Sequence, residues 1–210
     1  MSSPPPAAPA PAATFYFDLA SPVAYLAAER VLQTLPGPVE WQPVLSRELG
    51  GESFEAFRCA EDREIFLGEL ERRARELGLQ ALRWPDPFPF DSSLAMRAAT
   101  YAKSIGRVVA FAQAAFRQAF AGGHSLEDPD FVLIAAAACE MHPAAVMRAV
   151  ERRSVAEQLA AASAAAARSG VDDVPAVRVG GPCAQAPVYV GERALAEAAA
   201  QMQRERGAER

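Results

Sequence analysis

Segments with the composition of β-strands occur only near the two ends of this chain, and a long helical pattern separates them. Residues 14–18 and 39–45 are rich in aromatic and β-branched side chains, and the helical pattern of residues 23–35 lies between them. Residues 174–179 and 187–190 have the same strand character, and a final helical pattern follows them. Because strands need partners for their backbone groups, we expect the strands from both ends to meet in one sheet.

This order of elements predicts an α/β protein with a thioredoxin-like fold and an inserted all-helical domain. Residues 14–52 and 169–205 would form the two halves of the thioredoxin-like domain, and the alanine-rich residues 53–168 would form the insertion. Residues 1–13 carry repeated prolines, so we expect them to be a disordered tail. The alternative, a helical bundle with strands at its edge, leaves the terminal strands unexplained.

Composition and charge exclude several classes of function. The chain holds 21 basic against 26 acidic residues, whereas counterion release on nucleic acid needs a basic face. No apolar run reaches the roughly 20 residues that a membrane-spanning helix needs. Two histidines cannot build a convincing zinc cluster. We therefore expect no nucleic-acid, membrane or metal partner.

The cysteines and the N-terminus indicate the compartment. Cys59, Cys139 and Cys183 are far apart, odd in number and outside any CxxC motif, which suits reduced thiols. The proline-rich N-terminus lacks both the basic region and the Leu- or Val-rich region of an export signal. Together these features predict a cytoplasmic protein.

The first candidate functional residue is Ser21, which follows the first strand and precedes Pro22. Serine followed by proline is favoured at a helix start, with the serine as N-cap. A helix N-terminus also presents free N–H groups to an anion, and a serine hydroxyl there can donate a hydrogen bond to a thiolate. Ser21 is therefore either a helix cap alone or the residue that holds a bound thiolate.

The other candidates lie in the C-terminal part of the chain. We predict that the Val174-Pro175 peptide bond is cis and that Val174 faces Ser21, although an ordinary trans proline at a strand start is the simpler alternative. A cis bond would leave the backbone of Val174 free to pair with an extended ligand. Gly191 and Glu192 precede the last helix, where the glutamate either binds a ligand ammonium or complements the helix dipole.

Four stretches occur in a fixed order within about residues 14–201: FYFDLASPVAYLAAERV, WQPVL, FPFDSSLAMRAA and GVDDVPAVRVGG. Together they resemble the family of 2-hydroxychromene-2-carboxylate isomerases and kappa-class glutathione transferases, which belongs to the DsbA-like thioredoxin group. The resemblance implies that Ser21 replaces a redox cysteine and holds the sulfur of glutathione. It also implies that Val174 binds the cysteinyl backbone of glutathione and that Glu192 holds its γ-glutamyl end.

The same resemblance implies a function. The protein would be a glutathione- or small-thiol-dependent isomerase or transferase that acts on an aromatic or hydrophobic electrophile. The bound thiolate would add to the substrate, and expulsion of the thiol after ring opening or rotation would complete an isomerisation. The groove between the inserted helices and the thioredoxin-like domain would hold the apolar substrate. Family members are commonly dimers, so the resemblance is also compatible with a homodimer.

One rival function is excluded at the predicted site and a second stays open. A DsbA-type disulfide oxidoreductase needs two cysteines at the helix start, and Ser21 and Ala24 stand in those positions. A non-catalytic thioredoxin-like binding protein is favoured by Asp172 and Asp173, whose charges would oppose a thiolate. It is also favoured by residues 45–57, which lack the Asn and the Lys that the family often carries there. If both aspartates face the site, neutral replacements should tighten binding of an anionic thiol.

Overall fold

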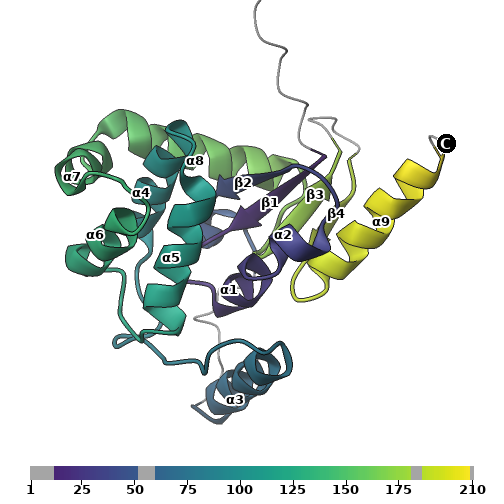
Figure 1. The fold of residues 1–210 in the computed structure, drawn as a ribbon, viewed down its shortest axis with the longest axis horizontal. Coiled ribbons are helices and arrows are strands. Elements are labelled where there is room, and N and C mark those ends of the chain that lie inside the picture. Colours follow the sequence, from purple (N-terminus) through teal and green to yellow (C-terminus); the bar gives the residue numbers. More distant parts are fainter. Residues whose placement is uncertain (1–11, 52–59, 181–185, 209–210) are drawn as a thin grey trace, which may run out of the picture.

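The computed structural model describes residues 12–51, 60–180 and 186–208, and its centre is a four-stranded mixed sheet (Figure 1). The strand order is β2-β1-β3-β4. The central strand β1 (Ala13–Phe17) pairs in parallel with β2 (Val39–Pro43) and antiparallel with β3 (Ala176–Val179). At the second edge, β4 (Val188–Val190) pairs antiparallel with β3. Strands from both ends of the chain therefore share one sheet, as the sequence predicts.

Helices supply most of the remaining structure (Figure 1). In chain order, the helical elements are α1 (Pro22–Ala28), α2 (Val31–Thr34), the 3₁₀ turn η1 (Ser46–Glu48), α3 (Ala60–Glu76), α4 (Ser93–Ser104), α5 (Val108–Phe120), α6 (Pro129–Ala137), α7 (Pro143–Val150), α8 (Arg153–Arg168) and α9 (Ala194–Ala208). No helix within the described ranges is long and apolar enough to cross a membrane.

The two faces of the sheet are covered by different helices, so every residue of β1 is buried. Successive side chains of a strand point to opposite faces. Phe17 therefore packs on one face, where its ring centroid lies 6.0 Å from that of Phe116 in α5. Tyr16 points to the other face and packs in a smaller apolar cluster with Ala166 of α8 and Ala176 of β3. This arrangement fixes the end of β1 firmly between two layers.

The apolar core runs without interruption from the sheet into the central helices. Tyr25 of α1 stacks on Phe120 of α5, with their ring centroids 5.7 Å apart, and Met96 of α4 is buried in the same cluster. The central helices therefore share one core with the thioredoxin-like elements.

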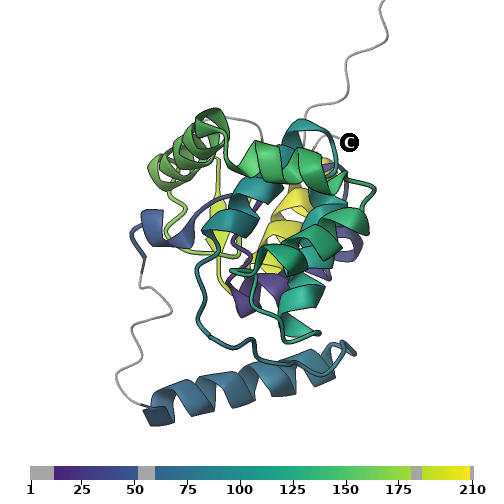
Figure 2. The same ribbon diagram turned by 90° about the vertical axis from the view of Figure 1, so that its left-hand side faces the viewer.

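Helix α3 lies apart from the other helices, along the lower edge of the molecule in Figures 1 and 2. It is attached through Leu70 and Ala74, which are fully buried. The indole N–H of Trp84 also donates a hydrogen bond of 2.7 Å to the carboxylate of Glu71. These contacts hold α3 beside α1, which matters for the groove described below.

The expected strands differ from the structure by one or two residues at their ends, and two other boundaries also differ. Residues 23–35 read as one helix, but α1 ends at Ala28 and a turn at Arg30 separates it from α2, since the N–H of Arg30 bonds to the carbonyl of Ala27. Residues 1–11 of the expected tail lie outside the described residues, whereas Ala13 already belongs to β1.

A bidentate ion pair joins the end of α1 to α5. The guanidinium of Arg117 donates two hydrogen bonds of 2.7 Å to the carboxylate of Glu29, whose side chain is only 11% exposed. The hydrogen bonding to Glu29 and the negative charge of that carboxylate outweigh partial burial and raise the pKa of the Arg117 guanidinium above its usual range. This pair ties a thioredoxin-like element to the helical block.

We expect Arg117→Ala to lower the free energy of unfolding by about 1 kcal/mol, because a paired and largely buried carboxylate loses its partner while Arg117 itself stays half exposed. Denaturant unfolding measures the change. Arg153→Ala is the matched control, because its ion pair with Glu157 is fully at the surface. Equal losses in the two variants would contradict a special role for the Arg117 pair.

Candidate functional site

Ser21 caps α1 immediately after the turn that follows β1. Its hydroxyl oxygen accepts the backbone N–H of Ala24 at 3.1 Å, so the capping role is real. The same hydroxyl donates to the carbonyl oxygen of Val174 at a longer distance of 3.5 Å. The Val174-Pro175 bond is cis. Both parts of the structural prediction are therefore confirmed: the bond is cis, and Val174 faces Ser21. We call this meeting of residues 18–21 with Val174 the Ser21 junction.

The first turn of α1 leaves one donor available at the Ser21 junction. Pro22 has no N–H, and the N–H groups of Ala24 and Tyr25 bond to the hydroxyl and the carbonyl of Ser21. The N–H of Val23 has no hydrogen-bond partner among the residues that the structure describes. A ligand atom beside the Ser21 hydroxyl could therefore accept from both groups.

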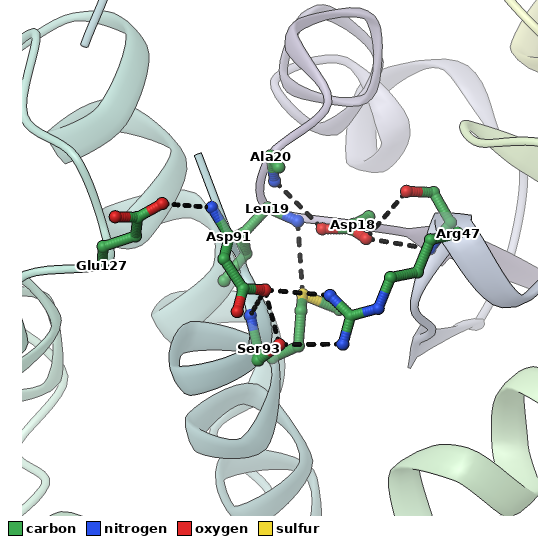
Figure 3. Close-up of polar contacts among 9 residues, drawn as sticks. Asp18, Leu19, Ala20, Arg47, Asp91, Ser93 and Glu127 are labelled. Atoms are coloured by element: carbon green, nitrogen blue, oxygen red, sulfur yellow. Dashed lines mark hydrogen bonds and ion pairs between the residues drawn. The ribbon is translucent and has the colours of Figure 1, made fainter. Parts of the chain in front are cut away.

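Asp18 fixes the turn that carries Ser21 (Figure 3). This side chain is buried, and one carboxylate oxygen accepts the N–H of Ala20 at 3.0 Å. The other oxygen accepts the N–H of Ser46 at 2.9 Å and its hydroxyl at 3.0 Å. The carbonyl of Asp18 also accepts the N–H of Ser21. Asp18 thus joins the Ser21 turn to η1 and orients it.

The sequence reasoning missed Arg47 and its partners at the start of α4. The guanidinium of Arg47 donates 2.9 Å hydrogen bonds to the Asp91 carboxylate and to the Ser93 hydroxyl (Figure 3). Partial burial acts to raise the pKa of Asp91, but the hydrogen bonds from Ser93 and Arg47 outweigh it and lower that pKa. The signal for this contact in the sequence is the arginine within residues 45–57.

The remaining candidates join the Ser21 junction through Pro175. The carbonyl of Pro175 accepts the N–H of Gly191 at 2.8 Å, which places the β4–α9 turn next to the cis bond. Gly191 has a φ of 82°, a backbone conformation that glycine adopts without strain. Glu192 follows it and borders an open groove. All five sequence-predicted site residues are therefore grouped in space.

This shallow groove is open to solvent and runs between α1, the end of α3 and the start of α9. It combines a largely apolar lining with three charged side chains; the lining residues are Val23, Leu26, Ala27, Arg30, Arg73, Leu77, Glu192 and Leu195. Such a composition suits a small molecule with an apolar body. Because Val23 belongs to the lining, the groove opens beside the Ser21 junction.

The two aspartates before Val174 also belong to the junction. The Asp173 carboxylate accepts the N–H of Val174 at 2.7 Å, so the chain itself occupies the donor that a ligand backbone would use. Gly51 approaches closely: a Cβ there would lie 2.2 Å from the carbonyl oxygen of Asp172. Asp173 is exposed as a residue, but partial burial of its carboxyl, helped by the charges of Asp172 and Asp18, raises its pKa although the N–H of Val174 acts in the opposite direction.

No cysteine stands at the start of α1. The positions equivalent to a redox pair at the start of α1 hold Ser21 and Ala24. Cys139 is a free, buried thiol whose pKa is raised by burial. Cys59 and Cys183 lie outside the described residues.

Comparisons with known proteins agree with this architecture. The family model of the DsbA-like thioredoxin domain matches residues 13–203. A solved structure of 2-hydroxychromene-2-carboxylate isomerase superposes with a TM-score of 0.79 at 17% identity, over 92% of this chain and 95% of that one. A probable DsbA oxidoreductase from Streptomyces coelicolor gives a TM-score of 0.74 at 19% identity, over 93% and 89% of the two chains.

The cytosolic disulfide reductase DsbM from Pseudomonas aeruginosa, solved with GSH, gives a TM-score of 0.62 at 14% identity, over 93% of this chain and 97% of that one. No curated protein matches the sequence. At these identities the solved structures establish the fold alone. The central mixed sheet, the Ser21 turn facing a cis-proline and the family model over nearly the whole chain all lead to one assignment. This chain belongs to the DsbA-like thioredoxin domain family.

Proposed function

We propose that this protein binds glutathione or another low-molecular-weight thiol at the Ser21 junction. The observation that carries the proposal is the Ser21 hydroxyl, which faces Val174 across 3.5 Å beside the unpartnered N–H of Val23. A thiolate beside α1 would accept one hydrogen bond from the Ser21 hydroxyl and one from the N–H of Val23. Hydrogen bonds to the charged form of a group favour that form, so the pKa of the bound thiol would fall.

The chemistry proposed for this thiolate is an isomerisation or transfer on an aromatic or hydrophobic electrophile. The sulfur forms a bond to an electrophilic carbon of the substrate, which accepts the electron pair. In an isomerisation, bond rotation or ring opening follows, the carbon–sulfur bond breaks, and the thiol leaves unchanged. The groove lined by Val23, Leu26 and Leu195 would hold the apolar body of the electrophile next to the sulfur.

The structural neighbours support the proposal in two ways. One of them is a 2-hydroxychromene-2-carboxylate isomerase, and another was solved with GSH. The absence of a cysteine from the start of α1, where Ser21 and Ala24 stand, favours thiol binding over disulfide exchange at this position. The likeness to a cytosolic reductase and the separated cysteines support a cytoplasmic location.

A second candidate function is a thioredoxin-like binding protein without catalysis. It is favoured by Asp173, whose carboxylate already occupies the N–H of Val174 and carries a charge that opposes a thiolate. In that case the groove would take a ligand that needs no thiol.

Calorimetric titration with glutathione separates these functions. We expect the wild type to bind it and Ser21→Ala to bind it about tenfold or more weakly, because a hydrogen bond to a charged group is worth roughly 1.5–3 kcal/mol. Ser125→Ala is the matched control, since Ser125 also accepts a backbone N–H two residues ahead, in a different loop. Equal affinities of wild type and Ser21→Ala would exclude Ser21 as the thiol-binding group. Glutathione binding without turnover of any aromatic electrophile would favour the binding protein.

A further inference from the structure

The carboxylates at the Ser21 junction have no cationic partner. The Asp173 carboxylate lies 2.7 Å from the N–H of Val174, and the carbonyl of that same residue faces the Ser21 hydroxyl. Asp172 precedes Asp173 in the chain. The side chain of Asp18 is buried, and its backbone carbonyl accepts the N–H of Ser21. None of the ion pairs found in residues 12–51, 60–180 and 186–208 includes any of these three aspartates.

The arginines around the junction are engaged elsewhere or remote. Figure 3 shows the Arg47 side chain directed to the start of α4, where Asp91 and Ser93 hold it at 2.9 Å. Arg193 pairs with Glu197, one turn further along α9. Arg30 lies beyond the far end of α1, about 13 Å along the helix direction from Ser21, where salt screens its charge.

These charges disfavour an anion at the junction and favour a cation. A bound thiolate adds a negative charge near Asp172 and Asp173. The affinity of the ligand then depends on the charge of its other groups. The pKa of Asp173 is raised mainly by burial of its carboxyl, and the charges of Asp172 and Asp18 add to that shift. A positive group of the ligand that lies next to the aspartates offsets the negative charges of both the carboxylates and the thiolate.

We propose that Asp172 and Asp173 make this site selective for thiols that carry an ammonium or another cationic group, over thiols that carry a carboxylate. The inference rests on the proposed function, because it concerns which thiol the Ser21 junction accepts. The groove beside the junction does not add to this preference, because Arg30 and Arg73 line it together with Glu192. The substrate class that follows is an aminothiol, or a cysteinyl compound with a free amine near its sulfur.

Three small thiols of similar size test this selectivity: cysteamine is positive, 2-mercaptoethanol is neutral and 3-mercaptopropionate is negative at neutral pH. Dissociation constants are measured by NMR titration of the full chain at low ionic strength. We expect the wild type to bind cysteamine about tenfold more tightly than 3-mercaptopropionate, with 2-mercaptoethanol between them. Added salt should reduce the differences among the three dissociation constants, because it screens the charges.

The double variant Asp172→Asn/Asp173→Asn should bind all three thiols with affinities within about twofold of one another. Asparagine at position 173 keeps an oxygen that can accept the N–H of Val174, so the loop retains its hydrogen bond. Glu151→Gln, which removes an exposed carboxylate on another part of the surface, should keep the wild-type order.

The outcomes separate this inference from the function on which it rests. Equal affinities for the three thiols in the wild type, or an unchanged order in the double variant, would overturn the charge selectivity and leave thiol binding intact. Failure of the wild type to bind any of the three thiols and glutathione would overturn both proposals.

Discussion

Replacement of Phe120 by alanine is expected to lower the free energy of unfolding by about 3–5 kcal/mol, because a buried ring is removed and the surrounding structure closes only in part. Phe120 is fully buried at the end of α5. Its ring centroid lies 5.7 Å from that of Tyr25, 6.1 Å from Phe88 and 6.4 Å from Phe90. The ring therefore joins α1, α5 and the segment that leads from α3 into α4.

Denaturant unfolding of Phe120→Ala and two companions tests this role. Phe120→Leu retains most of the buried volume and should lose less stability than the alanine variant. Ile105→Ala removes a side chain that is 45% exposed, and we expect a loss below about 1 kcal/mol. A loss for Phe120→Ala as small as that for Ile105→Ala would show that α1 and the helical block do not share a tightly packed core.

Replacement of Asp18 by alanine should lower the free energy of unfolding by about 2–4 kcal/mol, since it leaves three partly buried donors without an acceptor. Three donors lose their partner: the N–H of Ala20, the N–H of Ser46 and the Ser46 hydroxyl. Asp18 is only 2% exposed, so water replaces it poorly. The variant should also weaken glutathione binding, because the turn that positions Ser21 is no longer tied to η1.

Asp130→Ala is the control for the Asp18 variant, because Asp130 is exposed in the first turn of α6 and its carboxylate accepts no hydrogen bond within the described ranges. Ser46→Ala removes one of the three donors and should lose a smaller part of the stability. If Asp18→Ala were as stable as Asp130→Ala, the hydrogen bonds of Asp18 would have no net value. If it lost stability but bound glutathione normally, its positioning role would be wrong.

Much of the architecture follows from local sequence patterns. The segments 14–18 and 174–179, which contain most of β1 and all of β3, are short, apolar and bounded by turn residues. The pairing of β1 with β3 follows from the need to satisfy backbone groups. Ser21 and Val174 could be predicted as neighbours because Ser-Pro marks a helix start and Val-Pro marks a strand start. The family resemblance then placed these two starts at one site.

Other features depend on contacts between distant parts of the chain and left no local pattern. The ion pair of Arg47 with Asp91 spans 44 positions in the sequence, and that of Glu29 with Arg117 spans 88. The engagement of the Val174 N–H by Asp173 depends on the exact turn geometry, which composition does not reveal. Sequence reasoning therefore located the site but could not describe its electrostatic state.

The central claim is that the Ser21 hydroxyl stabilises a bound thiolate. The direct measurement is a pH titration of the ultraviolet thiolate absorbance of protein-bound glutathione, taken as a difference from the glutathione-free protein to remove the signal of its own cysteines. The account predicts that the pKa of the bound thiol lies below the ordinary value of about 8.5 in the wild type. In Ser21→Ala that pKa should rise by about 1–2, while loss of the helix cap lowers stability by only about 1 kcal/mol. The same titration midpoint in wild type and Ser21→Ala would contradict the claim.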